Sequence, residues 1–183
     1  MRKFNAVLSI SILVLFLIHM IVGSFQLFGF MPGGIAVMYA VTDTMLLGVV
    51  VHMVIGIKLT IDTLKAQKNA GVSYFRENAL FWTRRISGFA LMLFIAAHIV
   101  IFSGKGEGSG FRLNLFDVPQ LLCSVLMVAS LILHIVTNIR PLMIALGARS
   151  FGKFLADAGI VLSVVLLAAA AAFVVYFIRW SFP

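Results

Sequence analysis

Long apolar stretches alternate with short polar segments along the whole chain. Five stretches reach the ~20 residues that a helix needs to cross the hydrocarbon core of a bilayer. No stretch alternates apolar and polar residues with a period of two, which argues against a β-barrel. We therefore expect an all-α integral membrane protein whose five helices form one domain over residues 1–183. The predicted spans are Asn5–Phe28, Val37–Ile61, Ile86–Ser103 (starting as early as Leu80), Pro119–Ile139 and Leu155–Phe177.

The start of the chain also has the pattern of a signal peptide, because Met1-Arg2-Lys3 precedes an apolar run. That run extends from about Ala6 to Phe30, which is long enough to span a bilayer. We therefore expect a retained first membrane helix.

Composition agrees with a membrane protein, and the distribution of charge predicts its orientation. The chain is 62% hydrophobic and 11% charged, too apolar for a soluble domain of 183 residues. Its net charge of +8 could suit nucleic acid, but long apolar runs separate the basic residues, so no nucleic-acid partner is expected. The positive-inside rule places the N-terminus in the cytoplasm and the C-terminus outside. The basic residues predicted inside are Arg2, Lys3, Lys58, Lys65, Lys68, Arg76, Arg84, Arg85, Arg140, Arg149 and Lys153; those predicted outside are Lys105, Arg112 and Arg179.

All four histidines of the chain lie inside predicted spans, one on each of the first four: His19, His52, His98 and His134. Ionisable side chains are costly in a membrane and usually have a function there. A single histidine could equally serve as a hydrogen-bonding group between helices, but four at once favour a shared site. The lone cysteine, Cys123, excludes an internal disulfide and a cysteine-based metal cluster within the chain.

The positions of the histidines predict two pairs at two depths. At ~1.5 Å per helical residue, His52 and His134 each lie ~9 Å from a basic residue on the cytoplasmic side. His19 and His98 lie ~20–24 Å from that side by the same measure. We therefore expect an inner pair and an outer pair, as two stacked haems with two histidine ligands each would need. Iron with two axial imidazoles has no open position for substrate, so such haems transfer electrons.

An internal repeat supports this pairing. The segment that begins at His52, His-Met-Val-Ile-Gly-Ile-Lys, matches the one that begins at His134, His-Ile-Val-Thr-Asn-Ile-Arg. A weaker match links the segment that ends at His19, Leu-Phe-Leu-Ile-His, with the one that ends at His98, Leu-Phe-Ile-Ala-Ala-His. The repeat predicts that paired histidines face one another across a four-helix bundle, with the fifth helix packed outside it. Small residues four positions from a histidine are expected to let a flat macrocycle approach the backbone, although ordinary helix packing also favours them. These residues are Gly23, Gly48, Gly56 and Ser130.

The chain resembles the di-haem cytochrome b subunit of prokaryotic succinate dehydrogenases and fumarate reductases. The resemblance lies in the five spans, in one histidine on each of the first four, and in Arg85-Ile86-Ser87-Gly88 before His98. The resemblance covers nearly the whole chain. It implies two haem b groups, the outer on His19 and His98 and the inner on His52 and His134. Some members of that family carry a glutamate two residues before the fourth histidine, where this chain has Ile132, so a proton route through that position is not expected.

The resemblance also implies partners: an iron–sulfur subunit and a flavoprotein with FAD, both on the cytoplasmic side of a bacterial or archaeal inner membrane. The loop from Lys58 to Arg85 is a candidate docking surface for them, or a solvated loop near lipid headgroups. Electrons would pass between the iron–sulfur clusters and a membrane quinone, more typically menaquinone than ubiquinone, in a complex that could be dimeric or larger.

Further polar residues are candidates for contacts with the cofactors. Three basic side chains near the inner pair could bind the inner-haem propionates, or instead lipid phosphates or the iron–sulfur subunit, and Arg112 could bind the outer propionates. Two serines could form hydrogen bonds with haem or quinone. These candidates are Lys58, Arg85, Arg140, Arg112, Ser24 and Ser87. Asp43 is the acid predicted within the second span at the outer depth, and it is our candidate for proton exchange with a quinone, or else a helix-end residue in contact with water.

Two other functions fit parts of the pattern. A haem b subunit of another respiratory dehydrogenase would also bind haem, but such subunits often carry two ligands on one helix. A small proton-coupled transporter with relay histidines would bind no haem. One histidine per helix favours the succinate/fumarate family.

Overall fold

The computed structural model has the five helices that the hydropathy pattern predicts, and all five are long and apolar enough to cross a membrane. It describes residues 1–71, 78–103, 113, 116–147 and 152–181, with the backbone alone for 153–156. The helices are α1 (Arg2–Phe28), α2 (Ala36–Asn69), α3 (Ala79–Ser103), α4 (Val118–Ala145) and α5 (Gly152–Ser181). The predicted all-α class and its five spans are thus confirmed.

Local sequence signals explain where several helices begin and end. Gly29 ends α1 with a φ of 84°, a left-handed conformation that glycine adopts without strain. Asp117 precedes α4 and forms a capping box with Gln120, and Pro119 occupies the first turn, where its missing N–H costs nothing.

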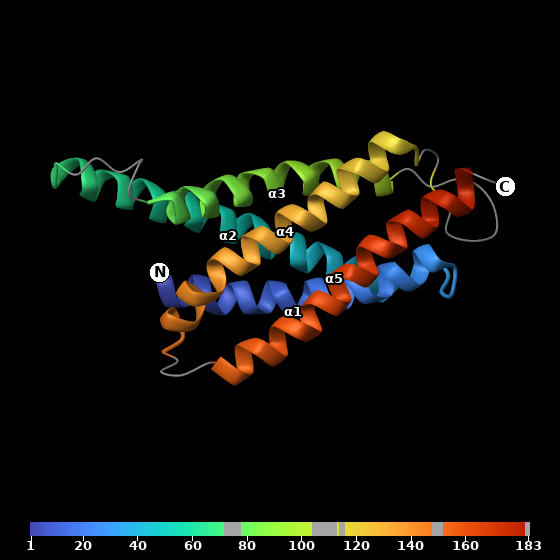
Figure 1. Cartoon of the computed structure of the whole chain (residues 1–183), viewed down its shortest axis with the longest axis horizontal. Coiled ribbons are helices and arrows are strands. Elements are labelled where there is room, and N and C mark those ends of the chain that lie inside the picture. The colour runs from blue at the N-terminus through green and yellow to red at the C-terminus, as the bar shows by residue number, and fades with distance from the viewer. Residues whose placement is uncertain (72–77, 104–112, 114–115, 148–151, 182–183) are drawn as a thin grey trace.

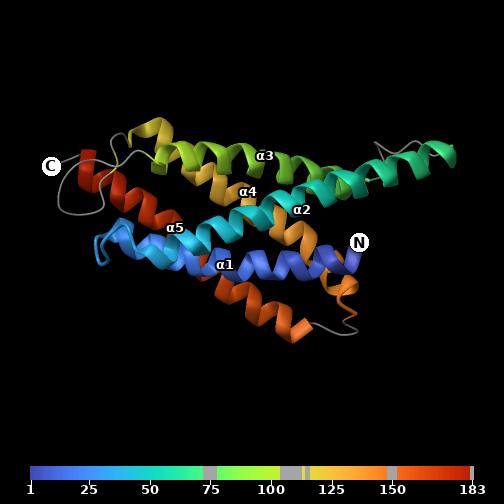
Figure 2. The ribbon, with the colours of Figure 1, turned by 180° about the vertical axis from the view of Figure 1, so that it is seen from behind.

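All five helices extend beyond the apolar segments that predicted them, for example α2, α3 and α4. Helix α2 continues to Asn69, eight residues past Ile61, α3 begins at Ala79, and α4 continues through Pro141 to Ala145. Hydropathy marks only the part of a helix that matches the hydrocarbon core. The polar end of α2 is rich in helix-forming Lys, Gln and Leu, and it projects past the N-terminus of the chain (Figures 1 and 2).

The helices are arranged as two antiparallel pairs joined by α5. Helix α1 packs against α2 and α3 packs against α4, while α5 crosses both α1 and α4 (Figure 1). Within the described residues, no Cα atom of α2 lies within 8 Å of a Cα atom of α3 or α4. The two pairs are therefore separated on one side of the bundle.

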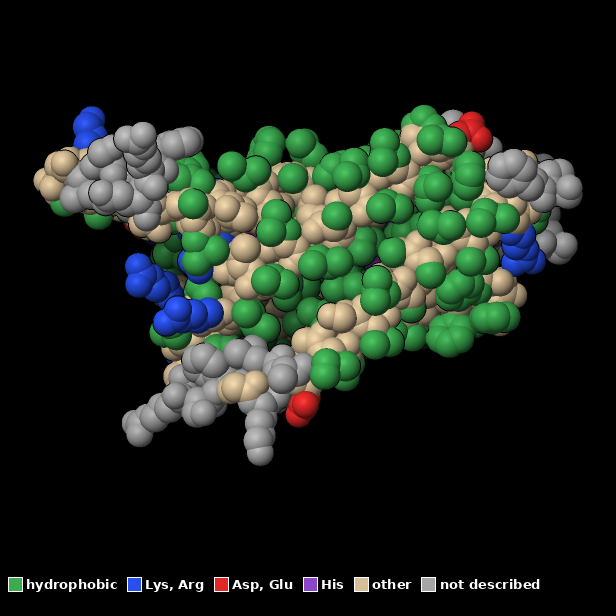
Figure 3. Space-filling model, viewed as in Figure 1, with side chains coloured by type: hydrophobic (Ala, Val, Ile, Leu, Met, Phe, Trp, Pro, Cys, Tyr) green, Lys and Arg blue, Asp and Glu red, His purple; other side chains and the backbone are tan. Residues whose placement is uncertain are grey.

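The surface is mostly apolar between the two ends of the bundle, and Lys and Arg side chains gather at the ends (Figure 3). Large side chains such as Val100, Ile86 and Leu47 are more than 60% exposed, as expected where lipid is the solvent. The most buried residues cluster toward the end of the bundle that contains the C-terminus, and many belong to α5: Leu166, Ala169, Ala172, Phe173 and Tyr176.

Candidate functional site

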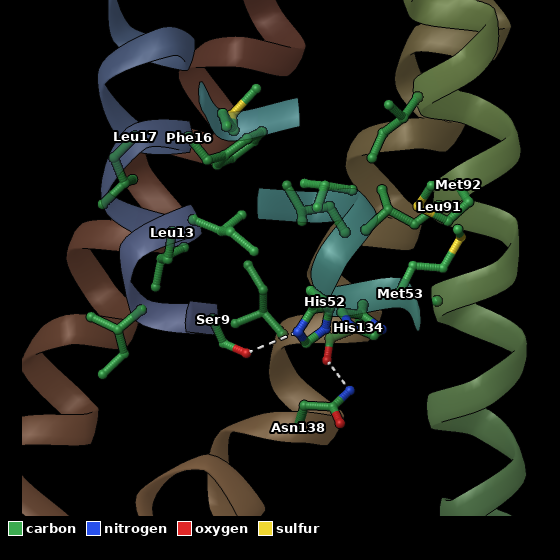
Figure 4. A pocket seen from close by; sticks show the side chains of 18 of the residues that line it. Ser9, Leu13, Phe16, Leu17, His52, Met53, Leu91, Met92, His134 and Asn138 are labelled. Carbon is green, nitrogen blue, oxygen red and sulfur yellow. Dashed lines mark hydrogen bonds between the residues drawn. The ribbon is translucent and has the colours of Figure 1, made fainter. Parts of the chain in front are cut away.

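Four histidine side chains meet in two pairs inside the bundle. The rings of His19 on α1 and His98 on α3 have centroids 6.2 Å apart and planes at 81°. The rings of His52 on α2 and His134 on α4 have centroids 6.4 Å apart and planes at 89°. Figure 4 shows the second pair side by side, between α2 and α4. The pairs expected from the depths are therefore neighbours in the structure, whereas their role as iron ligands stays a prediction.

The ring spacing suits one metal ion between each pair. An imidazole nitrogen binds a transition metal at ~2 Å, and the ring centre lies ~1 Å behind that nitrogen. Two imidazoles on opposite sides of one ion therefore place their centroids ~6 Å apart. Perpendicular planes are compatible with this arrangement, because either ring can rotate about the nitrogen–metal axis without breaking a bond.

The two pairs lie at different depths. On α1, Ser9 contacts His52 of the inner pair, and His19 of the outer pair follows ten residues later. On α2, Thr42 contacts His19 of the outer pair, and His52 of the inner pair follows ten residues later. Ten helical residues rise ~15 Å, so the structure has an inner pair nearer the N-terminus of the chain and an outer pair beyond it.

Hydroxyl groups hold three of the four rings by their Nδ1 atoms. Ser9 Oγ lies 3.2 Å from His52 Nδ1, Thr42 Oγ1 lies 3.4 Å from His19 Nδ1, and Ser87 Oγ lies 3.3 Å from His134 Nδ1. Each ring is thus tied to a neighbouring helix. A histidine that binds a metal usually donates its other ring N–H in this way, which fixes the tautomer.

The direction of these hydrogen bonds follows from the other bond of each hydroxyl. Ser9 donates to Asn5 O at 2.7 Å, Thr42 donates to Met38 O at 2.7 Å, and Ser87 donates to Arg84 O at 3.2 Å. When its one hydrogen is on the carbonyl, each hydroxyl oxygen is an acceptor toward the imidazole. This arrangement suits the tautomer with its proton on Nδ1, and that tautomer keeps a lone pair on Nε2, as a metal ligand needs.

The Arg-x-Ser-Gly segment of α3 surrounds the inner pair. Ser87 is 2% exposed and holds His134, while a Cβ atom on Gly88 would lie 3.1 Å from His134 Cε1. Arg85 lines the cavity described below, and its guanidinium lies 5.0 Å from the centre of the Phe81 ring. Ser87, proposed from sequence as a cofactor contact, is instead placed behind the histidine.

A single cavity of about 2290 Å³ contains all four histidines. Pockets for drug-sized ligands measure ~300–1,000 Å³, so this space could hold two large flat groups. Residues of all five helices line it. No group of three or more His, Cys, Asp or Glu side chains that could hold a metal ion occurs among the described residues. Ligation by two histidines per ion suits a metal whose remaining ligands come from a macrocycle.

The structure separates the basic residues proposed for the inner haem. Arg85 and Arg140 line the cavity, but Lys58 is exposed and is not among the lining residues. The sequence prediction missed Arg84, which also lines the cavity and donates from Nε to Thr137 O at 2.7 Å. Arg112, proposed for the outer haem, lies outside the described residues.

Other predicted positions have mixed outcomes. Asp43 and Ser24 line the cavity, and the hydroxyl of Ser24 donates to Met20 O at 2.8 Å. Gly23 and Gly56 also line it, and a Cβ atom on either would meet nothing within 4 Å.

Two of the small residues do not face the cavity. A Cβ atom on Gly48 would lie 3.0 Å from Ile12 Cγ1, so Gly48 permits close packing of α1 on α2. Ser130 is not among the residues that line the cavity. For Gly48 the structure shows the ordinary helix packing that the sequence left open as the alternative, because a residue four positions from a histidine can also contact the neighbouring helix.

Helix α5 contributes more than the outer packing expected of it. Phe173 lies with its ring centroid 6.4 Å from that of His98, and Ala169 and Leu162 also line the cavity. Phe102 of α3 packs on the same histidine, with centroids 4.3 Å apart, and its ring lies 6.1 Å from that of Phe173. Aromatic rings therefore cover one side of His98.

The sequence signal for the hydroxyls was present but easily overlooked. Ser9 and Ser87 are separated by 78 positions, as are Leu15 and Leu93 in the weaker repeat, so the serines also belong to it.

No family model, curated protein or solved structure matches this chain.

Proposed function

We propose that this chain is the membrane anchor and electron-transfer subunit of a succinate:quinone oxidoreductase, with two b haems bound by its histidine pairs. The observation that carries the proposal is two histidine pairs with centroids 6.2 and 6.4 Å apart in one large cavity. The hydroxyls on three Nδ1 atoms support it, because they suit the tautomer that leaves Nε2 free for iron. The assignment to succinate/fumarate enzymes rests on the resemblance of the sequence.

In this function the protein binds, orients and insulates its cofactors. Haem iron would supply reversible one-electron chemistry, and two histidines per iron would leave no position for oxygen or substrate. Phe102, Phe173 and α5 side chains would keep water from that side of the outer pair. Arg85, Arg140 and Arg84 line the cavity and are suited to bind haem propionates by charge-assisted hydrogen bonds.

Substrate and partners would meet the bundle at its two ends. The basic ends of α2 and α4 would face the cytoplasm, where an iron–sulfur subunit and a flavoprotein with FAD would dock. Asp43 lines the cavity at the depth of the outer pair and would exchange protons with a quinone, such as menaquinone.

Haem quantification of the purified full-length chain tests the proposal. We expect two haem b per chain, with a reduced-minus-oxidised band typical of six-coordinate haem. His52→Ala should remove the inner haem and His98→Ala the outer one, leaving one each. A chain without haem would contradict the proposal and favour a transporter, and His52→Ala that removes only the outer haem would contradict the depth assignment.

Copurification tests the identity of the complex. A partner subunit with covalently bound flavin is expected to remain associated with the chain after mild solubilisation. A haem-loaded chain whose partners lack such flavin would instead indicate another respiratory dehydrogenase.

A further inference from the structure

The outer histidine pair has an asymmetry that the inner pair lacks. His19, His52 and His134 each have a hydroxyl at Nδ1, but His98 Nδ1 is buried and has no hydrogen-bond partner among the described residues. A buried polar group without a partner is unfavourable, because it has lost its hydrogen bonds to water. A nearby hydroxyl with a free acceptor position would remove that cost.

The internal repeat points to Ser124 as that hydroxyl. His52 and His134 are equivalent in the repeat, and Thr42 and Ser124 each precede their histidine by ten residues. Ser124 donates to Gln120 O at 2.9 Å, as Thr42 donates to Met38 O. The Ser124 oxygen can therefore only accept from an imidazole, as the Thr42 oxygen does toward His19. At 1% exposure, Ser124 is also shielded from competing solvent.

The packing of α3 on α4 places Ser124 at the level of His98. The two helices are antiparallel, and Ser87 of α3 contacts His134 of α4. His98 lies eleven residues after Ser87 on α3, and Cys123, the neighbour of Ser124, lies eleven residues before His134 on α4. Because the helices are antiparallel, both counts lead to the same level of the bundle. The ring contact between Phe102 and Phe116, with centroids 6.2 Å apart, fits the same alignment.

We propose that Ser124 is a positioning residue whose oxygen accepts a hydrogen bond from His98 Nδ1–H, completing a set of four hydroxyl-held imidazoles. Ser9 precedes His19 by ten residues, whereas Ser87 precedes His98 by eleven. The extra residue turns His98 by ~100° around its helix relative to His19. This rotation explains why the hydroxyl contact of His98 differs from the other three. The consequence of this contact for iron rests on the proposed function.

Redox titration of the purified full-length chain tests this role. A hydrogen bond from Nδ1–H makes the imidazole a stronger ligand and favours ferric iron. Ser124→Ala should therefore lower the ferric-to-ferrous ratio of the outer haem about tenfold at a fixed potential, an upward shift of ~59 mV in midpoint potential. The inner haem should keep its potential, and Ser124→Thr should restore the outer one.

Ser163→Ala is the matched control. Ser163 lies on α5 and donates to Gly159 O at 2.7 Å, the same bond within its helix, but it is exposed. Neither haem should change in this variant. An unchanged outer potential in Ser124→Ala, or an equal shift of both haems, would overturn the proposal.

A second measurement does not depend on haem. Nitrogen-15 spectra of the haem-free chain report which ring nitrogen of His98 carries the proton. We expect the Nδ1–H form in the natural chain and a mixture of tautomers in Ser124→Ala. Identical His98 spectra would refute the role of Ser124, whereas absence of haem from the natural chain would refute the proposed function alone.

Discussion

Ser9, Thr42 and Ser87 each donate to a backbone carbonyl three or four residues earlier in their own helix, so each presents only an acceptor to the neighbouring imidazole. This arrangement uses no charged group, which suits a bilayer interior where charges are costly. It also anchors each of these rings to a second helix. The tautomer that these hydroxyls suit has a free lone pair on Nε2, which the proposed iron ligation would need.

Removing the inner hydroxyls should alter only the inner site. In Ser9→Ala and Ser87→Ala the midpoint potential of the inner haem should rise, because its ligand loses a hydrogen bond, and the double variant should show the larger rise. Potentiometric titration measures this. Ser11→Ala is the control, since Ser11 is exposed and donates to Val7 O within its own helix. A shift confined to the outer haem would contradict the assignment of the pairs.

Gly88 should not tolerate a larger side chain. A Cβ atom there already lies 3.1 Å from His134 Cε1 and 3.4 Å from Nδ1, so the branched side chain of Gly88→Val would displace the ring. We expect the inner haem to be lost and the outer haem to be retained, as measured by haem content. Gly152→Val, at a position where a Cβ atom meets nothing within 4 Å, should keep both. Full retention in Gly88→Val would count against a fixed His134 ring.

At the level of the helices, α5 closes the bundle. It packs on α1 and α4, and Tyr176, 1% exposed, accepts a hydrogen bond from Leu113 N at 2.7 Å. The Tyr176 ring also meets Phe116 edge to face, with centroids 5.2 Å apart. Arg179 donates to Phe28 O at the end of α1. These contacts join α5 to the segments that connect the other helices.

Loss of the Tyr176 hydroxyl should weaken this closure. Tyr176→Phe keeps the ring but leaves Leu113 N–H unpaired in a buried place, which should lower the free energy of unfolding by ~1–3 kcal/mol. Denaturation of the chain in detergent, followed by circular dichroism, measures the change. Ser163→Ala is the control, because it removes an exposed hydroxyl from the same helix. Equal losses in both variants would show that the Leu113 bond adds nothing.

For the whole molecule, all five helices line the cavity, while α5 and the α1–α2 and α3–α4 contacts hold the bundle together. Such a large space would be unfavourable if it stayed empty, because packed interiors leave few voids larger than a water molecule. Two flat cofactors between the helix pairs would replace the missing contacts.

The orientation of the molecule can be tested with reporter fusions. Charge asymmetry predicts a cytoplasmic end of α2 and an exterior C-terminus. A fluorescent protein fused after Lys68 should therefore fluoresce, and alkaline phosphatase fused after Arg179 should be active. The opposite pattern would place the inner histidine pair near the outer face and reverse the proposed docking side.

The sequence by itself determined the five helices, because apolar length is what a bilayer selects, and it grouped the four histidines by depth, because helical rise converts position into distance. It could not decide which face of each helix meets which neighbour. Packing therefore left Lys58 outside the cavity that Arg85 and Arg140 line. It also placed Gly48 at the contact with α1 and brought Phe173 of α5 beside His98. The hydroxyl partners were also a tertiary outcome, since each joins residues from different helices whose approach no local pattern specifies.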